Sequence, residues 1–447
     1  MTRDREARTH DTDDRDTGND ADSYDFDDYD TDLTRSDAVA RVDELREAVL
    51  ADRGSETAGL AAIGGRVLAE AIVASEDRPA HDRATMDGFA FDATGEYPFE
   101  VVSAVFPEDD PPEIRADEAV EIATGAPLPT GANAVLKREE ATIGDGELRG
   151  TEIEPGTYVY RQGSNVAAGE TLFERGERLS PKDAILLRDL GVEDVPVYER
   201  SSAGVLATGT EIHEGTQADF DSPMLCGLVD SWGGAATYEG SVPDERGAVE
   251  DRISDLAGTY DVVITTGGTS VGKKDYVLRA LADLGEIVFH RVLIRPGKPI
   301  AAARLPDHDA VAFAIPGKPV GAHTIATLVM RPFFTGDGTE TPTPTIEATL
   351  ARKVEIGPEG FEYAVPVTVR NDSDANSDGG DRSGVGNGIE VMPLGHVDSP
   401  LSVYDERFDP SVLSSSTRAT RADGFFLTES GVERDETVSV VPYTALE

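Results

Sequence analysis

The stretch "VVITTGGTSVGKKDY" (262–276) joins a β-branched run to a glycine-rich turn and a charged segment. A short apolar run that ends at glycines is typical of a buried strand in a parallel sheet. The glycines at 267, 268 and 272 fit neither the GxxxxGK[ST] nor the GxGxxG phosphate loop. Open α/β sheets bind ligands outside the carboxyl ends of their strands, and this turn would lie at such an end. The stretch therefore predicts an α/β domain with a ligand-binding loop.

The sequence around this stretch predicts that the α/β domain covers residues 200–338. Strand-like and helix-like segments alternate there, in the order "AGVLAT", "MLCGLVDSWG", "AATYEGSV", "ERGAVEDRISDLAG", "YDVVITT", "YVLRALADLG" and "AVAFAIP". Such alternation predicts a doubly wound, mainly parallel sheet. We expect Cys226, the single cysteine of the chain, to be buried and inert on an apolar helix face.

Short strands broken by Gly and Pro precede and follow this domain, so the fold class is multidomain, α/β plus β. We expect β-rich N-terminal and linker domains over 37–199, with helices at 36–50 and 180–191 that begin at Ser36 and Ser180 as N-caps. A C-terminal β domain is expected over 345–443, with a flexible insertion at 370–388. Residues 1–36 are dense in Asp and predict a disordered acidic tail.

The composition excludes several classes of protein. The 447 residues carry 86 acidic and 40 basic side chains, a net charge of -46, while 39% hydrophobic content still indicates a folded chain. Acidic residues spread along the whole sequence fit adaptation to high salt, which screens self-repulsion. No basic stripe is available for nucleic acid, and no apolar run approaches the roughly 18 residues of a membrane span. With a polar N-terminus that does not resemble a signal peptide, we expect a cytoplasmic protein.

The glycine-rich turn and its neighbours predict an anion site. Gly267 and Gly268 would let the backbone approach an anion, and Ser270 would add a hydroxyl. "LIRPGKP" (293–299) and "AIPGKPVG" (314–321) follow on neighbouring segments. Four of the few lysines gather in this region, at positions 273, 274, 298 and 318. A tight structural turn with solvated lysines is the alternative.

Carboxylates occur at the same turns, and they predict a cation beside the anion. These are Glu211 in "ATGTEI", Asp244 in "SVPDER" and Asp275 after the glycine-rich turn. Carboxylates beside a phosphate site usually hold Mg²⁺, which bridges to phosphate oxygens. Helix capping or simple solvation is the alternative for each residue taken singly.

Together these segments resemble the MoeA/gephyrin-type molybdopterin-binding proteins. "TTGGTSVGKKDY", "LIRPGKP" and "AIPGKPVGAHT" are similar to the GGVSxGxxDY, KPGKP and LPGNPVS patterns of that family. "GRVLAEAIVASEDRPAHDRATMDGFAF" (65–91) resembles its N-terminal signature ending in MDGYA, and "IATGAPLPTGANAVLKREE" (122–140) its TGAP segment. "ATRADGFFLTESG" (419–431) is similar to its C-terminal domain. The resemblance covers about residues 37–443 in order.

The resemblance implies molybdenum cofactor biosynthesis by a molybdopterin molybdotransferase. Such proteins insert molybdate into adenylylated molybdopterin (molybdopterin-AMP) and release AMP with Mg²⁺. The resemblance also implies a homodimer whose cleft lies between the α/β domain of one subunit and the MDG- and TGAP-bearing domain of the other. Motif matching assigns the catalytic roles to Asp87, Thr124, Glu211, Asp244, Asp275 and Lys298, with Asp244 and Asp275 at the metal. The implied binding residues are Gly267, Gly268, Ser270, Gly272, Arg291, Arg295, Pro316 and Gly317.

The sequence departs from the family pattern at the oxyanion side of the site. Arg291 and Arg295 stand where the family has lysines, and Lys318 and Gly321 replace Asn and Ser. The family's D-[ST]-N reads "DSP", with Pro223. The family's C-terminal-domain arginine has no counterpart, and its serine corresponds to Ser399 or to one of 414–416.

Two other functions stay open beside the molybdotransferase. One is a non-catalytic paralogue that carries molybdopterin. The other is an α/β hydrolase that acts on nucleotide-like substrates. The hydrolase is weakened by the MDG and TGAP motifs. The sequence does not distinguish molybdenum from tungsten.

Overall fold

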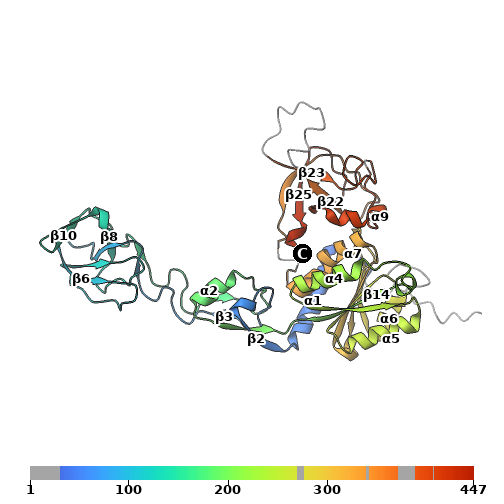
Figure 1. The fold of residues 1–447 in the computed structure, drawn as a ribbon, viewed down its shortest axis with the longest axis horizontal. Helices are drawn as coiled ribbons and strands as arrows, with labels where there is room; N and C mark the ends of the chain where they lie inside the picture. The colour runs from blue at the N-terminus through green and yellow to red at the C-terminus, as the bar shows by residue number, and fades with distance from the viewer. Residues whose placement is uncertain (1–30, 269–275, 339–341, 371–387, 406) are drawn as a thin grey trace, which may run out of the picture.

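The computed structural model describes residues 31–268, 276–338, 342–370, 388–405 and 407–447. The molecule is extended, with a β domain at one end, a small domain beside it and an α/β domain at the other end (Figure 1). The C-terminal β domain stands on one side of the α/β domain. No helix in the described ranges is both long and apolar enough to cross a bilayer.

A seven-stranded mixed sheet forms the centre of the α/β domain, in the order β1-β17-β19-β20-β16-β14-β15. Its strands are β1 (Thr31–Leu33), β14 (Ser202–Thr208), β15 (Ala235–Val242), β16 (Val262–Thr266), β17 (Glu286–Val292), β19 (Ala301–Leu305) and β20 (Ala310–Ile315). The neighbours β15, β14, β16 and β20 are parallel, whereas β19 runs antiparallel to β20 and β17. The expected doubly wound, mainly parallel sheet is confirmed, and β19, which lies between β17 and β20 inside the sheet, is antiparallel to both of them.

Helices cover both faces of this sheet because the central strands are apolar on both sides. Val205 and Ile264 pack with the helices of one face, whereas Leu206 and Val263 pack with those of the other. This is the period-two alternation of a buried strand. The first face carries α1 (Arg35–Ala51), α4 (Asp221–Ser231), α7 (Pro319–Ile325), the π-helix η5 (Ala326–Met330) and α8 (Arg331–Thr335). The second face carries α5 (Arg246–Ala257) and α6 (Tyr276–Leu284).

The C-terminal domain is a small closed β barrel. Its strands are β21 (Ile346–Leu350), β22 (Glu362–Val369), β23 (Ile389–Pro393), β24 (Gly424–Thr428) and β25 (Thr437–Pro442), and β22 pairs with β24 to complete the ring. The short strand β18 (Ile294–Arg295) pairs in parallel with β22. The "LIRPGKP" segment is therefore attached to the C-terminal barrel and does not form a strand of the main sheet.

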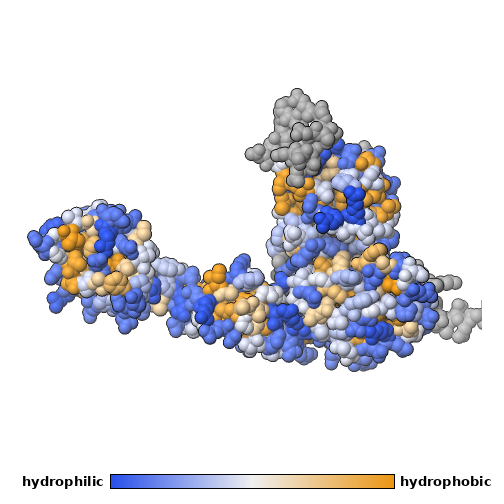
Figure 2. All heavy atoms as spheres, in the orientation of Figure 1, coloured by the Kyte–Doolittle hydropathy of each residue, from blue (hydrophilic) through white to orange (hydrophobic). Residues whose placement is uncertain are grey.

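The two N-terminal β-rich domains form the extended arm of the molecule. The distal domain has a six-stranded sheet in the order β8-β5-β7-β6-β10-β9. These strands are β5 (Gly88–Phe91), β6 (Phe99–Val105), β7 (Glu118–Ile122), β8 (Ala134–Lys137), β9 (Ala141–Gly144) and β10 (Glu147–Gly150). Hydrophilic residues cover much of the visible surface of the arm, with apolar residues in separate groups on each domain (Figure 2).

A small domain connects the distal sheet to the rest of the chain. It contains the long-range antiparallel pairs β2 (Ser55–Gly59) with β13 (Asp194–Tyr198) and β3 (Ile72–Val73) with β12 (Thr171–Phe173), together with α2 (Asp183–Asp189). These elements share their own hydrophobic core. Its two connections to the α/β domain are residues 52–54, between α1 and β2, and residues 199–201, between β13 and β14.

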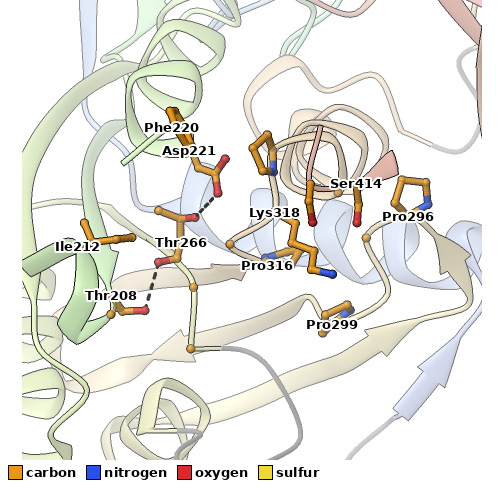
Figure 3. Close-up of a pocket in the computed structure, with 18 of the residues that line it drawn as sticks. Thr208, Ile212, Phe220, Asp221, Thr266, Pro296, Pro299, Pro316, Lys318 and Ser414 are labelled. Carbon is orange, nitrogen blue, oxygen red and sulfur yellow. Dashed lines mark hydrogen bonds between the residues drawn. The ribbon is translucent and has the colours of Figure 1, made fainter. Parts of the chain in front are cut away.

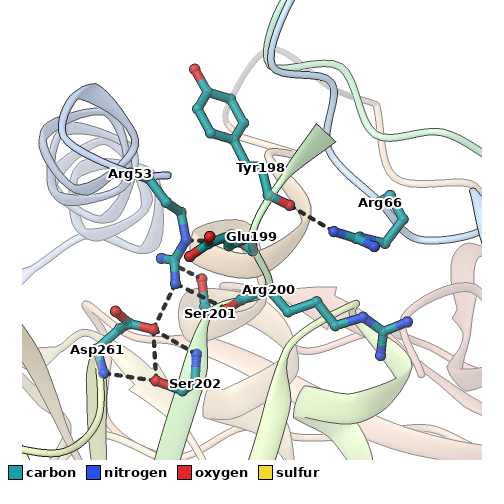
Figure 4. Close-up of polar contacts among 8 residues, drawn as sticks. All are labelled: Arg53, Arg66, Tyr198, Glu199, Arg200, Ser201, Ser202 and Asp261. Carbon is teal, nitrogen blue, oxygen red and sulfur yellow. Dashed lines mark hydrogen bonds and ion pairs between the residues drawn. The ribbon is translucent and has the colours of Figure 1, made fainter. Parts of the chain in front are cut away.

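Arg53 holds the two connections together (Figure 4). Its guanidinium donates to the carbonyl oxygens of Glu199 and Arg200 at 2.8 and 3.0 Å, to the Ser201 hydroxyl at 3.0 Å and to Asp261 at 2.6 Å. The Arg53 side chain is only 7% exposed. These bonds fix the small domain to the edge of the α/β domain.

The structure corrects four local expectations. Residues 31–33 form strand β1 and α1 begins at Arg35, so the predicted disordered tail does not extend to residue 36. Thr34, not Ser36, caps α1, because its hydroxyl accepts from the Asp37 amide at 3.2 Å. Helix α2 begins after Lys182 rather than after Ser180, although Ser180 still bonds to the Asp183 side chain. Cys226 is only half-buried. The rest of the tail (1–30) and most of the 370–388 insertion (371–387) lie outside the described residues.

Candidate active site

A cavity of about 830 Å³ opens where the carboxyl ends of β14, β16 and β20 meet the C-terminal domain (Figure 3). Its walls come from the turns that follow these strands, from the 295–299 segment and from α9 (Pro410–Leu413) of the C-terminal domain. The structure brings together there these residues predicted from sequence: Glu211, Asp244, Gly267, Gly268, Arg295, Lys298, Pro316 and Gly317. The cavity therefore lies at the strand ends where the sequence analysis predicted a ligand-binding loop.

Close backbone packing explains the glycines at the floor of the cavity. Gly267 has φ +91°, and a Cβ there would lie 2.6 Å from the Thr208 carbonyl oxygen. The Gly267 amide donates to the Ile315 carbonyl at 3.0 Å, and a Cβ on Gly317 would lie 3.0 Å from the Gly267 Cα atom. These two positions exclude larger residues even without a ligand. Packing within the turn is therefore enough to explain why Gly267 and Gly317 are glycines. Both residues also line the cavity.

Three cationic side chains line one side of the cavity in the described part of the chain: Arg295, Lys298 and Lys318. Phe361 of the C-terminal domain lies beneath two of them, with its ring centroid 4.1 Å from the Arg295 guanidinium carbon and 5.0 Å from the Lys298 Nζ atom. Lys318 Nζ donates to the Ser411 carbonyl at 3.4 Å. Contacts with the C-terminal domain therefore fix the cations that sequence analysis placed near the α/β strands.

Asp221 is a functional candidate that the sequence analysis did not select. It lines the cavity at the start of α4, and it is 6% exposed. Its Oδ2 atom accepts from the Thr266 hydroxyl at 3.1 Å, whereas Oδ1 has no hydrogen-bond partner among the described residues. Burial raises the pKa of Asp221 to about 6, with the nearby Asp219 adding to the rise and the Thr266 hydrogen bond opposing it. In the sequence analysis, Asp221 appeared only as the first residue of the "DSP" segment, which departs from the family's D-[ST]-N pattern at Pro223.

Two of the carboxylates predicted near the cation, Glu211 and Asp244, line the cavity. Glu211 is in the short helix α3 (Thr210–His213) and Asp244 is in the turn before α5, where its amide donates to the Thr210 hydroxyl at 3.1 Å. Glu245 occupies the N-cap position of α5, so capping does not account for Asp244. Within the described ranges, no three His, Cys, Asp or Glu side chains gather closely enough to hold a metal. Asp275, the second predicted ligand, is outside the described residues.

The C-terminal domain contributes serines to the cavity wall. Of the candidates named above, Ser414 and Ser415 line the cavity, and the unpredicted Ser411 joins them. Ser399 is buried elsewhere, where its hydroxyl accepts from the Gly395 amide at 3.0 Å and donates to the Leu401 carbonyl at 2.8 Å. Sequence spacing could not choose among these serines because long-range folding of the barrel decides which of them face the cavity.

Several predicted site residues do not line this cavity. Arg291 is not among the residues that line the cavity, and its Nε atom lies 4.0 Å from Asp32 Oδ1. Asp87 and Thr124 lie on the distal domain, where the Thr124 amide and hydroxyl donate to Asp87 Oδ1 at 2.6 and 2.7 Å. These hydrogen bonds lower the pKa of Asp87. Ser270 and Gly272, together with the lysines at 273 and 274, fall outside the described residues.

Family models match most of the described chain. The model of the MoeA N-terminal region (domain I and II) matches residues 33–191, and that of a probable molybdopterin-binding domain matches residues 204–336. A molybdopterin molybdenumtransferase of Synechococcus elongatus is 30% identical over 324 residues, which cover 67% of this chain and 79% of that protein. The chain belongs to the MoeA family.

Further relatives of the MoeA family agree with this membership. A molybdopterin molybdenumtransferase of Haemophilus influenzae is 31% identical over 293 residues, covering 63% of this chain and 72% of that protein. The crystal structure of a molybdopterin biosynthesis MoeA protein of Pyrococcus horikosii superposes with a TM-score of 0.63 at 25% identity, covering 90% of this chain and 98% of that one. The predicted family and multidomain fold class are confirmed.

The structure also clarifies how this MoeA chain departs from the family pattern. A Cβ on Gly321 would meet its nearest atom, the Gly297 amide nitrogen, at 3.5 Å, an ordinary contact. The glycine that replaces the family's serine is therefore not required by packing. Lys318, which replaces Asn, reaches the C-terminal domain through the Ser411 carbonyl. Both departures leave the cavity wall intact.

Proposed function

We propose that this protein inserts molybdate or tungstate into adenylylated molybdopterin and releases AMP. The observation that carries the proposal is the cavity, in which exposed glycine backbone, carboxylates and a cluster of cations meet in a MoeA-family chain. Cleaving a phosphoanhydride needs charge neutralisation and orientation more than a protein nucleophile. The cavity supplies these features.

Each wall of the cavity has a role in the proposal. The glycine backbone at 267 and 268 faces the substrate phosphates, as the predicted Ser270 and Gly272 would. Arg295 and Lys298 bind the oxyanion, because guanidinium and ammonium groups form charge-assisted hydrogen bonds with such anions. Ser414 and Ser415 close the oxyanion side from the C-terminal domain.

Mg²⁺ is part of the proposal, with Asp244 and Asp275 as its ligands and Glu211 beside them. Mg²⁺ is commonly held by one or two carboxylates together with substrate phosphates and water, so a site with few protein carboxylates suits this ion. When bound, Mg²⁺ would neutralise charge on the phosphate oxygens. The chain's own contribution is to orient the phosphates against the cations.

We further propose a homodimer in which Asp87 and Thr124 of one subunit approach the cavity of the other. The support is their position: both are exposed on the distal domain, Asp87 just before β5 and Thr124 just after β7, away from the cavity of their own chain. Gly88, which follows Asp87 and begins β5, packs closely against β8, because a Cβ there would lie 1.9 Å from the Leu136 carbonyl oxygen. This close packing holds the backbone next to Asp87.

Adaptation to high salt and a cytoplasmic location complete the proposal. A net charge of -46 supports the first, and the single cysteine, which allows no disulfide within the chain, is consistent with the second. We expect the melting temperature to rise as KCl increases from about 0.1 M to about 2 M, because salt screens repulsion between carboxylates. A flat or falling trend contradicts the salt adaptation. Cell fractionation tests the location.

The proposed activity is tested by AMP release. Purified protein is incubated with adenylylated molybdopterin, Mg²⁺ and either molybdate or tungstate. Asp244→Asn and Asp275→Asn should each lower turnover by roughly 10²–10³, the loss typical when one stabilising group is removed. Asp251→Asn, an exposed position on α5, is the matched control and should retain turnover. Full turnover in a folded Asp244→Asn or Asp275→Asn variant would remove that residue from the metal site.

A non-catalytic molybdopterin carrier is the weaker alternative. Several relatives at about 30% identity bear the name molybdopterin molybdenumtransferase, which favours the enzyme. If the chain is a carrier, the incubation described above yields bound ligand but no AMP.

A further inference from the structure

Strand β1 brings a carboxylate to the cationic side of the cavity. It pairs in parallel with β17 at the edge of the main sheet, with Thr31 opposite His290 and Leu33 opposite Val292. The Leu33 carbonyl also accepts from the Leu293 amide at 2.7 Å. This pairing anchors the segment beside the loop that carries Lys298.

Asp32 forms an ion pair with Lys298. The distance from Asp32 Oδ1 to Lys298 Nζ is 2.8 Å, and Arg291 Nε lies 4.0 Å from the same oxygen. Lys298 is partly exposed, at 29%, and it lines the cavity. Among the described residues, neither Arg295 nor Lys318 has a carboxylate within ion-pair distance, so Lys298 differs from the other two cations of the cavity.

The ion pair with Asp32 partly neutralises the Lys298 ammonium group, which would otherwise be available to an oxyanion. On its other side, Lys298 lies 5.0 Å from the centroid of the Phe361 ring. An incoming tetrahedral dianion must therefore share Lys298 with Asp32 or displace it, and the two negative charges repel. Because Asp32 is on the same chain, its carboxylate is present at a high effective concentration beside Lys298. It therefore displaces weakly bound monovalent anions from Lys298 more effectively than tightly bound dianions.

We propose that Asp32 is a specificity-determining residue whose carboxylate competes as an internal anion for Lys298, so that only a strongly bound oxyanion dianion gains this cation. The inference rests on the proposed function, because it takes Lys298 as an oxyanion ligand. It adds a residue that lies before the matched family region, which begins at residue 33.

The test measures molybdate binding to the full-length protein by isothermal titration calorimetry. Asp32→Asn removes the charge and keeps the side-chain shape, and Asn tolerates the left-handed backbone of Asp32 (φ +57°). We expect its Kd for molybdate to fall by about 3- to 10-fold, as for removal of one like charge near a partly exposed ion pair. The KM for molybdate should fall by the same factor, and chloride should compete better than in the wild type.

A matched control separates this effect from a general change of charge. Asp398 also forms an ion pair, with Arg352 at 2.7 Å, and its exposure of 50% is close to the 42% of Asp32, but it does not line the cavity. Asp398→Asn should leave the Kd for molybdate unchanged. An unchanged or weaker affinity in folded Asp32→Asn would overturn the proposal, and a weaker one would instead make Asp32 a residue that positions Lys298.

A double-mutant cycle distinguishes failure of this inference from failure of the proposed function. In the Lys298→Ala background, Asp32→Asn should give no gain in affinity, because the cation for which it competes is absent. A gain that persists there overturns the inference. If the wild type binds molybdate but never releases AMP, the proposed function fails, whereas the tighter binding of Asp32→Asn still supports the role of Asp32.

Discussion

The cavity and the distal domain both carry motifs of the MoeA family, but the motif residues line a cavity in the first and lie exposed on the surface in the second. Around the cavity, residues from distant parts of the chain converge, and burial raises the pKa of Asp221 to about 6. On the distal domain, the exposed Thr124 donates hydrogen bonds from its amide and its hydroxyl to the exposed Asp87 carboxylate. These bonds lower the pKa of Asp87. No described residue between 55 and 199 lines the cavity. The comparison teaches that one chain can bring distant segments together at its cavity while it holds the family motifs of its distal domain away from that cavity.

The largest expected effect comes from combining a defect in each region. Lys298→Ala and Asp87→Asn should each lower AMP release by about 10²-fold in homodimers. If the proposed homodimer forms, a heterodimer of the two variants, purified through two different affinity tags, would contain one intact composite site. By two-fold symmetry it should recover about half of the wild-type activity. No recovery in a stable heterodimer would break the comparison, because the two groups would then not meet across subunits.

A smaller effect is expected where the arm joins the α/β domain. Arg53→Met removes the guanidinium that donates to the Glu199 and Arg200 carbonyls, and it leaves the Asp261 carboxylate with the Ser202 amide and hydroxyl as donors but without its cation. The loss should lower the free energy of unfolding by about 2 kcal/mol. The buried Trp232, the single tryptophan, reports unfolding of the α/β domain by fluorescence.

The matched control for this junction is Arg149→Met on the distal sheet. Arg149 forms an exposed ion pair with Glu147 at 3.1 Å, which should contribute less than about 0.5 kcal/mol. Equal losses for Arg53→Met and Arg149→Met would show that the junction is no more important than the arm surface.

The pH dependence of stability should differ in sign between the two regions. Asp221 has a pKa raised to about 6 in the folded protein, so the folded state holds its proton more tightly than the unfolded state, where the pKa is near 3.8. Its stability penalty is therefore absent below about pH 4, grows as the pH rises to 6 and is complete above that. Asp221→Asn should raise the free energy of unfolding by about 1–2 kcal/mol above pH 6 and by little at pH 4.

Asp92 of the distal domain is the opposite case. Hydrogen bonds from Thr94 lower its pKa, so ionised Asp92 contributes stability above the unfolded pKa, and this is lost as the pH falls through the folded value. Asp92→Asn should thus lower the melting temperature at neutral pH and have less effect in acid. Calorimetric scans between pH 4 and 8 test both variants, and shifts of the same sign would contradict the assigned environments.

The smallest expected effect concerns Phe361. Phe361→Leu removes the ring beneath Arg295 and Lys298 and should weaken molybdate binding by about 2- to 5-fold, the range for a partly exposed cation–π contact. Arg175→Met, which removes the cation 5.6 Å from the Tyr198 ring centroid in the small domain, should leave the Kd for molybdate unchanged. Equal Kd values for Phe361→Leu and wild type would show that Phe361 only fills space.

Sequence by itself determined the local elements and the chemistry of the cavity. The alternation of apolar runs with amphipathic helices fixed the α/β domain, because strands and helices differ in the period of their buried positions. Glycine next to strand ends and the Pro-Gly-Lys segments indicated residues that line the floor and the cationic side of the cavity, since these residue types suit close backbone approach and anion binding. The family motifs then indicated the function.

Tertiary structure alone decided which of these residues meet. The pairing of β18 with β22, the choice of Ser414 over Ser399 and the burial of Asp221 depend on contacts between segments far apart in the chain. The ion pair between Asp32 and Lys298 likewise depends on a three-residue strand at the sheet edge, within a stretch whose composition predicts disorder. Composition and periodicity describe each segment against solvent, whereas burial and charge pairing depend on the partner segment that long-range packing supplies.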